Sequence, residues 1–289
     1  MKYTANYIGK RKRINNIFNS DGKCVIVPLD DNLISGPTTG IVDISTKLQQ
    51  IEKANPSAIL AYQGTLANIE DTTIPRILNL TASTIRSCHT KKVLISNIEY
   101  ALKMDADAVA VHINISSQYE SHMLEILGKV SGACDTYGIP LLVIIYPRCE
   151  SCDRNSLVQD ENYLLLKETD NQKYTELISH CVRIAYEMGA DIIKTQYTGS
   201  KESFDMVVKS ANGCPVIIAG GDIMKVNDLF QMIEGAMVSG ASGVSIGRNI
   251  FGRADSDIII KCIKDIVFLN QTAEYVMQKY QEYERRKKR

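Results

Sequence analysis

Eight short β-branched runs alternate with longer amphipathic segments along 289 residues, and no Gly-rich dinucleotide-binding loop interrupts them. Parallel strands joined by helical crossovers produce this alternation, and one barrel of eight βα units closes at about this chain length. We therefore predict an α/β fold, a single (β/α)8 TIM barrel that occupies residues 1–289 as one domain. An open, doubly wound sheet is the alternative.

The expected strands are short apolar segments that end at turn residues. They cover residues 24–29, 58–62, 77–80, 108–113, 141–146, 192–195, 216–219 and 243–246. The third has the weakest pattern, because residues 92–96 offer a second short strand nearby. Helical patterns cover residues 41–54, 119–137, 174–188, 204–210 and 228–238. Gly189 and Gly240 each stop a helix just before the next strand.

Three segments lie outside the repeating units. Residues 1–22 form an N-terminal extension. Residues 149–171, after the fifth strand, are long for a βα loop and predict either a lid or partner contact over the barrel mouth or a solvated insertion. Residues 271–289 read as a C-terminal helix with a basic tail, ERRKKR, for which we expect solvation and no nucleic-acid role.

Composition excludes several classes of protein. Hydrophobic residues make up 45% and charged residues 23%, and 33 basic residues balance 33 acidic ones, so no overall field points to nucleic acid or an anionic membrane. No apolar stretch approaches the roughly 20 residues that span a bilayer. We expect a cytoplasmic protein with reduced thiols among its eight cysteines. Cys149 and Cys152 form a CxxC pair, for which incidental loop thiols and a zinc or redox role both remain open.

Lys194 is the first candidate for chemistry, because it lies inside the apolar strand segment ADIIKTQYTG. Burial disfavours the ammonium form, and the neutral amine can attack a carbonyl carbon to form a Schiff base. The alternative is a structural ion pair with a strand carboxylate.

Polar residues at the ends of other strands are the next candidates, since barrel chemistry takes place at the C-terminal rim. Tyr146 could relay protons beside an imine, or simply pack at the rim. Arg148 could bind an anionic group or remain a solvated cation. Asp30 could act as a base. Asp31 could help to bind the substrate, although strand alternation would point its side chain away from the lumen.

Glycines follow the last two expected strands at Gly220, Gly221 and Gly247, and Arg248 comes next. Barrels commonly bind phosphate with backbone N–H groups of these two loops. The pair of loops therefore predicts a phosphorylated substrate.

Metal binding has no support in the histidine pattern. His89, His112, His122 and His180 show no metal-ligand spacing. We expect His112 to be a core or hydrogen-bonded residue, and we expect neither a metal nor a cofactor.

Seven segments, spread over nearly the whole chain, carry a resemblance to a known family. They are RINNIF (residues 13–18), VIVPLDDNLISGPTTGIVDI, DAVAVHINISS, PLLVIIYPR, GADIIKTQYTGS, PVIIAGGD and GASGVSIGRNIF. The chain resembles the class I aldolases that include archaeal-type fructose-bisphosphate aldolase and 2-amino-3,7-dideoxy-D-threo-hept-6-ulosonate synthase.

The resemblance implies a TIM barrel with an imine at Lys194, a proton-donating Tyr146 and an acidic Asp30. It also implies phosphate binding at Gly220, Gly221, Gly247 and Arg248, and assembly into a homo-oligomer, often a decamer. Asp31 stands where the family usually has histidine, and the loop after Tyr146 is long for the family, so these departures put the substrate in doubt.

The predicted function is a class I aldolase that joins or cleaves a phosphorylated ketose or triose such as dihydroxyacetone phosphate. Its aldehyde partner would be aspartate semialdehyde, on a biosynthetic route to an aminohydroxybenzoate. A fructose-bisphosphate aldolase of central metabolism and a non-catalytic sugar-phosphate-binding barrel are the alternatives.

Overall fold

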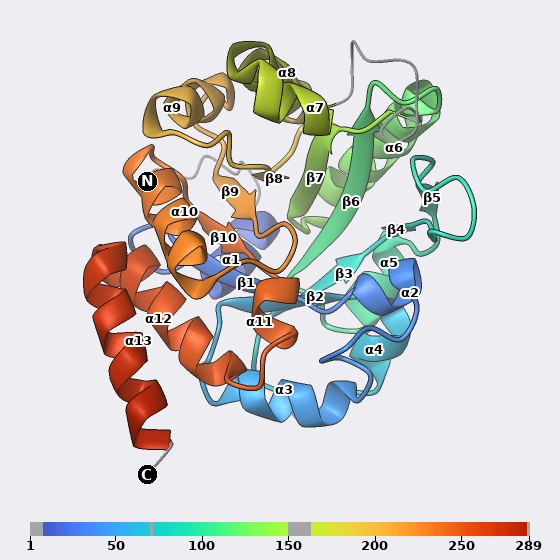
Figure 1. Ribbon diagram of the computed structural model, residues 1–289. Helices are drawn as coiled ribbons and strands as arrows, with labels where there is room; N and C mark the ends of the chain where they lie inside the picture. Colours follow the sequence, from blue (N-terminus) through green and yellow to red (C-terminus); the bar gives the residue numbers. More distant parts are fainter. Residues whose placement is uncertain (1–7, 70–71, 150–162, 288–289) are drawn as a thin grey trace.

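The computed structural model describes residues 8–69, 72–149 and 163–287. Eight parallel strands form a closed barrel (Figure 1), which excludes the open sheet. In chain order the barrel strands are β1 (Cys24–Pro28), β2 (Ala58–Ala61), β3 (Arg76–Asn79), β6 (Ala108–Ile115), β7 (Leu141–Pro147), β8 (Ile192–Thr195), β9 (Val216–Ala219) and β10 (Gly243–Ser245). All eight expected strands are confirmed, and their ends differ from the expected ones by at most two residues.

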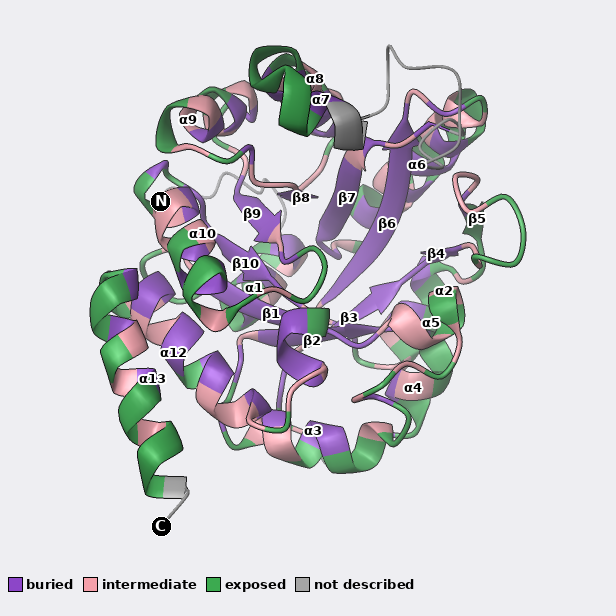
Figure 2. Cartoon of the chain, in the orientation of Figure 1, coloured by how far each residue is buried: buried purple, intermediate pink, exposed green. Residues whose placement is uncertain are grey.

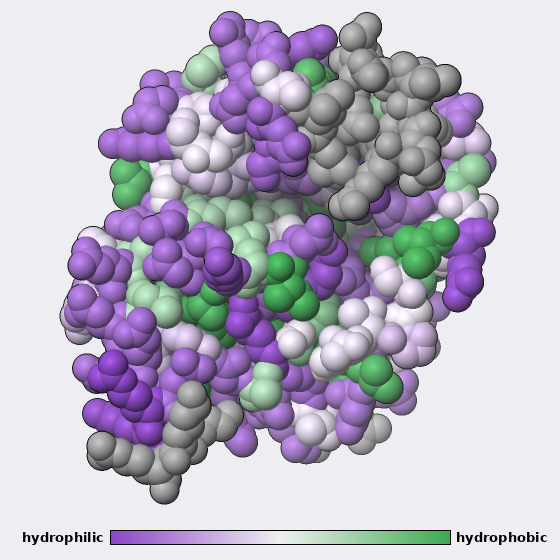
Figure 3. All heavy atoms as spheres, in the orientation of Figure 1, coloured by the Kyte–Doolittle hydropathy of each residue, from purple (hydrophilic) through white to green (hydrophobic). Residues whose placement is uncertain are grey.

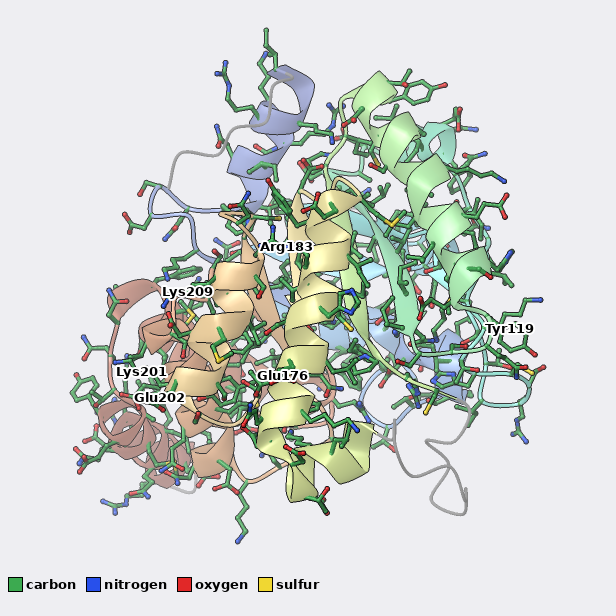
Figure 4. All side chains as sticks on the ribbon, turned by 90° about the horizontal axis from the view of Figure 1, so that it is seen from above. Tyr119, Glu176, Arg183, Lys201, Glu202 and Lys209 are labelled. Atoms are coloured by element: carbon green, nitrogen blue, oxygen red, sulfur yellow. The ribbon has the colours of Figure 1, made fainter. Side chains whose placement is uncertain are left out.

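Helices surround the barrel. They are α1 (Ile8–Ile17), α2 (Asp31–Ser35), α3 (Ile44–Glu52), α4 (Gln63–Ala67), α5 (Ile98–Lys103), α6 (Glu120–Tyr137), α7 (Tyr163–Thr169), α8 (Asn171–Glu187), α9 (Lys201–Ser210), α10 (Val226–Val238), α11 (Arg248–Phe251), α12 (Ser256–Leu269) and α13 (Ala273–Lys287). Figure 4 shows α8 and α9 side by side, with labelled charged side chains such as Glu176 and Lys209 on them. The predicted C-terminal helix is therefore present as α13.

Strand alternation divides the core into two parts, and almost every barrel-strand residue is buried (Figure 2). Residues of one parity pack against the surrounding helices, as Val25, Val109 and Ile193 do. Residues of the other parity fill the barrel lumen, as Ile26, Ala110 and Ile144 do. This parity decides which side chains can reach a substrate, because only the second set points inward.

Helix α1 closes the base of the barrel, within the segment expected to be a simple extension. Ile14, Ile17 and Phe18 pack in one cluster with the lumen residues at the bottom of the strands. Lys10 is 3% exposed and forms salt bridges with Asp135, at 2.6 Å, and Asp191, at 2.8 Å. Gly9 allows the close approach, since a Cβ there would lie 2.8 Å from the carbonyl oxygen of Gly138.

An excursion between β3 and β6 explains the ambiguous third strand. Strand β4 (Thr81–Ala82) pairs antiparallel with β5 (Val93–Leu94) outside the barrel. Residues 77–80 thus lie largely in the barrel, while the short strand expected at 92–96 belongs to this hairpin.

The long loop expected at residues 149–171 is not irregular throughout. Residues 150–162 lie outside the described residues, helix α7 occupies most of the rest, and α8 begins at Asn171. Over the described chain, none of the helices has the length and apolar character needed to cross a bilayer. Hydrophilic side chains dominate the face shown in Figure 3, and its hydrophobic groups are small and separate.

Candidate active site

Lys194 lies in the lumen near the carboxyl end of β8. Its neighbours in the ladder are Ile144 of β7 and Ile217 of β9, and it is 8% exposed. Burial lowers the pKa of its ammonium group, and Arg248 adds to this effect, while Asp30 and Asp31 oppose it. Among the described residues Lys194 forms no salt bridge, so the alternative of a structural ion pair has no support there.

Two neighbouring aspartates, Asp30 and Asp31, lie at the mouth near Lys194. The carboxylate of Asp30 accepts a hydrogen bond of 2.9 Å from Nδ2 of Asn79. The prediction that Asp31 points away is wrong, because β1 ends at Pro28 and Asp31 begins helix α2, where strand alternation no longer applies. Burial and the charge of Asp30 raise the pKa of Asp31, while Arg248, at 3.6 Å, and Lys194 partly offset this rise.

Tyr146 is one of the alternate residues of β7 whose side chains point into the lumen. It comes two residues after Ile144, the ladder partner of Lys194, and so lies one layer nearer the mouth than Lys194. Its ring meets the ring of His112 edge to face, with centroids 5.0 Å apart. His112 is 8% exposed, and its Nε2 has no hydrogen-bond partner among the described residues. The expectation of a core histidine is therefore incomplete, since His112 faces the lumen beside the reactive residues.

The two glycine loops lie next to each other at the ends of β9 and β10, and Asn249 holds them together. Its side-chain Nδ2 donates to the carbonyl oxygens of Gly220, at 3.0 Å, and Asp222, at 2.8 Å. A Cβ on Gly220 would lie 2.8 Å from Ile246, and Gly221 has a φ of 64°, so both positions suit glycine. Asn249 is 0% exposed and was not singled out as a site residue from the sequence.

Arg248 follows Gly247 at the start of α11 and is half-exposed. It forms salt bridges with Asp222 and Asp31. Arg248 therefore joins the glycine loops to the aspartate side of the mouth, where a phosphate would have to compete with two carboxylates for the guanidinium group.

Sequence reasoning missed a second buried lysine at the mouth. Lys92 is 1% exposed, and its Nζ donates a hydrogen bond of 2.6 Å to Oγ of Ser83. Burial lowers the pKa of Lys92 to about 7, and the nearby charge of Arg148 contributes. Lys92 begins the short strand considered at residues 92–96, but nothing in that pattern marks it as a site residue, because only the packing of the β4–β5 excursion brings it to the mouth.

The predictions about the CxxC pair and about metal ligands concern residues that the structure describes only in part. Cys149 is buried, whereas Cys152 lies outside the described residues, so the CxxC pair stays untested. The described residues contain no group of three His, Cys, Asp or Glu side chains arranged to hold a metal ion.

A closed (β/α)8 barrel with a buried lysine in its lumen and two glycine loops at its rim has the architecture of the Schiff-base aldolases. Residues 24–253 match the family model "DeoC/LacD family aldolase", and the chain belongs to this family. It is a class I aldolase, a metal-independent enzyme that makes or breaks carbon–carbon bonds.

Individual relatives agree with this assignment. The chain is 33% identical over 275 residues to 2-amino-3,7-dideoxy-D-threo-hept-6-ulosonate synthase 1 of Archaeoglobus fulgidus, covering 94% of this chain and 95% of the relative. It is 29% identical to 2-amino-4,5-dihydroxy-6-oxo-7-(phosphonooxy)heptanoate synthase of Streptomyces griseus, covering 84% of each. A solved Schiff-base-forming fructose-1,6-bisphosphate aldolase superposes with a TM-score of 0.78 at 26% identity, covering 90% of this chain and 100% of that one.

Proposed function

We propose that Lys194 forms the imine, with dihydroxyacetone phosphate as the donor and an amino-acid aldehyde, aspartate semialdehyde, as the acceptor. One observation carries the assignment of Lys194. Its amine is buried in the lumen, has a lowered pKa and forms no salt bridge within the described residues. A neutral amine in this position can attack a ketone carbon.

The proposed reaction begins when Nζ of Lys194 attacks the donor carbonyl carbon and a water molecule leaves. The resulting iminium ion withdraws electrons, so that a proton can leave the adjacent hydroxymethyl carbon and an enamine forms. That carbon attacks the aldehyde carbon of the acceptor, and the new alkoxide takes up a proton. Water then hydrolyses the imine and releases the product from Lys194.

Tyr146 and Asp30 are the proposed proton carriers in these steps. The phenol of Tyr146 lies one lumen layer above Lys194, where it can exchange a proton with the carbinolamine and the alkoxide. The carboxylate of Asp30, oriented by Asn79, acts as the supporting base beside the cationic imine. Asp31, held near Arg248, contributes to substrate binding.

The identity of the substrates follows from the product that one relative's name describes. A 2-amino-4,5-dihydroxy-6-oxo-7-(phosphonooxy)heptanoate has a ketone at C6 and a β-hydroxyl group at C4. Reversal of the aldol step breaks the bond between C4 and C5. The fragments are dihydroxyacetone phosphate and a four-carbon amino-acid aldehyde, which we transfer to this chain as its substrates.

The donor phosphate is proposed to bind between the glycine loops. Nothing lies within 4 Å of the place of a Cβ on Gly221, so the backbone between Gly220 and Gly221 is open to an anion there, while Gly247 belongs to the facing loop and Arg248 supplies a positive charge. Arg148, at the end of β7, lies on another part of the rim and is left for a different anionic group.

Borohydride reduction tests the assignment of Lys194. With dihydroxyacetone phosphate alone, reduction should add the mass of the reduced donor to one peptide, the one that contains Lys194. Lys194→Met should lose the adduct and aldol activity, while the exposed control Lys201→Met should keep both. An adduct on any other lysine, or none on the wild-type enzyme, would contradict the proposal.

Cleavage of fructose 1,6-bisphosphate is the second candidate, because a Schiff-base fructose-bisphosphate aldolase shares the fold at 26% identity. Comparing cleavage of this sugar with synthesis from aspartate semialdehyde under the same conditions separates the two. We expect synthesis to have the larger kcat/KM. A barrel that only binds sugar phosphate would show neither reaction.

We further propose that the enzyme acts in the cytoplasm as a homo-oligomer, a decamer by resemblance to its family. A native mass spectrum of the purified protein reports the subunit number directly, and a monomer would contradict the assembly.

A further inference from the structure

The second buried lysine, Lys92, has no role in the imine chemistry described above. Its Nζ contacts the neutral hydroxyl of Ser83, and within the described residues it forms no salt bridge. Asp30 is close enough to favour the charged form electrostatically, but burial and Arg148 outweigh it. A buried ammonium group without a paired anion is unfavourable, so the site is electrostatically incomplete.

Arg148 adds a second positive charge near Lys92, and we call this side of the barrel mouth, with Lys92 and Arg148, the wall. Its backbone N–H continues the β7–β6 ladder with a 2.8 Å hydrogen bond to Ile115, and position 148 has the lumen parity of Tyr146. The guanidinium charge helps to lower the pKa of Lys92, His89 and His112. His89 itself is neutral, because burial and these two cations lower its pKa to about 3.

The position of this wall in the barrel relates it to the bond-forming step. The glycine loops follow β9 and β10, Lys194 is on β8, and Tyr146 and Arg148 come at the end of β7. Lys92 lies beyond them, in the excursion between β3 and β6. In the donor, the phosphate and the nucleophilic carbon are on opposite sides of the imine carbon. The acceptor must therefore lie on the side of Lys194 away from the glycine loops, toward Lys92.

We propose that Lys92 and Arg148 form a second anion subsite, distinct from the donor phosphate site, that receives the carboxylate of the aldehyde acceptor. This inference rests on the proposed function of Lys194. A lysine and a planar guanidinium group together suit a carboxylate, which accepts charge-assisted hydrogen bonds on both oxygens. A bound carboxylate also supplies the negative charge that the wall lacks.

Two polar atoms on β6 complement the rest of such an acceptor. Oδ1 of Asn114 and Nε2 of His112 are buried, and neither has a hydrogen-bond partner among the described residues. Both residues have the lumen parity, at the layers of Tyr146 and Lys194. The amide oxygen can accept a hydrogen bond from the acceptor's ammonium group, and the imidazole lies close to the aldehyde end.

The test compares three aldehydes with one donor. Aspartate semialdehyde carries a carboxylate, glyceraldehyde 3-phosphate carries a phosphate, and propionaldehyde carries no charge. For Lys92→Met we expect the KM for aspartate semialdehyde to rise about 10- to 100-fold, the loss expected for one hydrogen bond to a charged group. The kcat/KM for propionaldehyde should stay within about twofold, and Lys92→Arg should restore much of the loss.

The adjacent Lys91→Met is the matched control, since it removes the same charge one residue away. Nζ of Lys91 lies 5.2 Å from the ring centroid of Tyr119, on the outside of the barrel (Figure 4). This variant should leave the KM and the kcat/KM for all three aldehydes unchanged. Arg148→Gln tests the same subsite from β7 and should likewise raise the KM for aspartate semialdehyde.

The outcomes separate this inference from the assignment of Lys194. Borohydride trapping of the donor should be normal in Lys92→Met. Equal losses with all three aldehydes, loss of the donor adduct, or a loss confined to glyceraldehyde 3-phosphate would overturn the carboxylate subsite while wild-type trapping still supports Lys194. A wild-type enzyme that traps no donor would instead refute the proposed function itself.

Discussion

Two buried lysines in one barrel mouth illustrate how local surroundings assign different tasks to the same side chain. Lys194 is on a strand with aliphatic neighbours and two aspartates above it. Lys92 is in an excursion, bonded to a serine hydroxyl and close to an arginine. Because the carboxylates near Lys194 stabilise a positive charge, they also suit the proposed cationic imine, whereas the surroundings of Lys92 suit the proposed external anion.

The pH dependence of imine formation should reflect the lowered pKa of Lys194. Only the deprotonated amine attacks a carbonyl, so the rate of imine formation should rise with pH and level off once the amine is deprotonated. The midpoint of this rise should lie below the ordinary pKa of 10.5. Asp31→Asn should lower this midpoint further, because it removes a charge that favours the ammonium form. Rapid mixing with donor followed by a borohydride quench measures the rate, and a midpoint at or above 10.5 would contradict the assignment.

Several site residues were predictable from the sequence, because polar side chains near the ends of apolar strands stand out. Lys194, Tyr146 and Asp30 are of this kind, although their catalytic roles stay predictions. Asp31 was misplaced because the end of β1 and the immediate start of a helix cannot be read from alternation. Lys92 and Asn249 were missed because their significance depends on contacts across loops that are distant in the sequence.

At the scale of elements, Asn249 connects the loops that follow β9 and β10. Its side chain donates to two carbonyl oxygens of one loop and accepts from the backbone N–H of Met224, at 2.9 Å. The spacing between the glycine-rich backbones therefore depends on one buried amide, which would position the phosphate site without touching the reacting carbon.

Asn249→Ala should weaken binding of the phosphorylated donor, because it leaves buried backbone groups unpaired and loosens the loops. We expect the KM for dihydroxyacetone phosphate to rise about tenfold, while the kcat/KM for unphosphorylated dihydroxyacetone changes little. Equal effects on both donors would indicate a general loss of structure and not a role in phosphate binding.

The barrel strands could be predicted because their hydrophobic period is strong and their spacing is regular. Helices α1 and α12 were not among the predicted helices. Helix α1 is rich in basic residues, and its two buried isoleucines, Ile14 and Ile17, do not stand out in the sequence. The β4–β5 hairpin is too short for periodicity to separate it from β3.

At the scale of the whole molecule, the N-terminal helix and the barrel are held together by a buried ion pair. Lys10 bridges Asp135, at the end of α6, and Asp191, just before β8. The two carboxylates outweigh the effect of burial and raise the pKa of Lys10. This stabilisation should be complete below the unfolded-state value of 10.5 and be lost as the pH rises through the higher folded-state pKa.

Lys10→Met should lower the free energy of unfolding by about 3 kcal/mol, because it leaves the largely buried carboxylate of Asp191 without its cation. The exposed neighbour Lys12→Met should change it by less than about 0.5 kcal/mol. Urea denaturation at neutral pH followed by circular dichroism measures both values. Equal stabilities of the two variants would show that the ion pair adds nothing to the attachment of α1.

The attachment of α1 also determines how molecules travel through the enzyme. Within the described residues, Ile17 and Phe18 cover the floor of the barrel and pack against the aliphatic lower lumen. In the proposed reaction, the water lost on condensation, the aldehyde, the hydrolytic water and the product are therefore expected to pass the rim at the carboxyl ends of the strands. Substrates, water and product would then share this opening of the barrel. A bound aldehyde would hinder the return of water until the new carbon–carbon bond has formed.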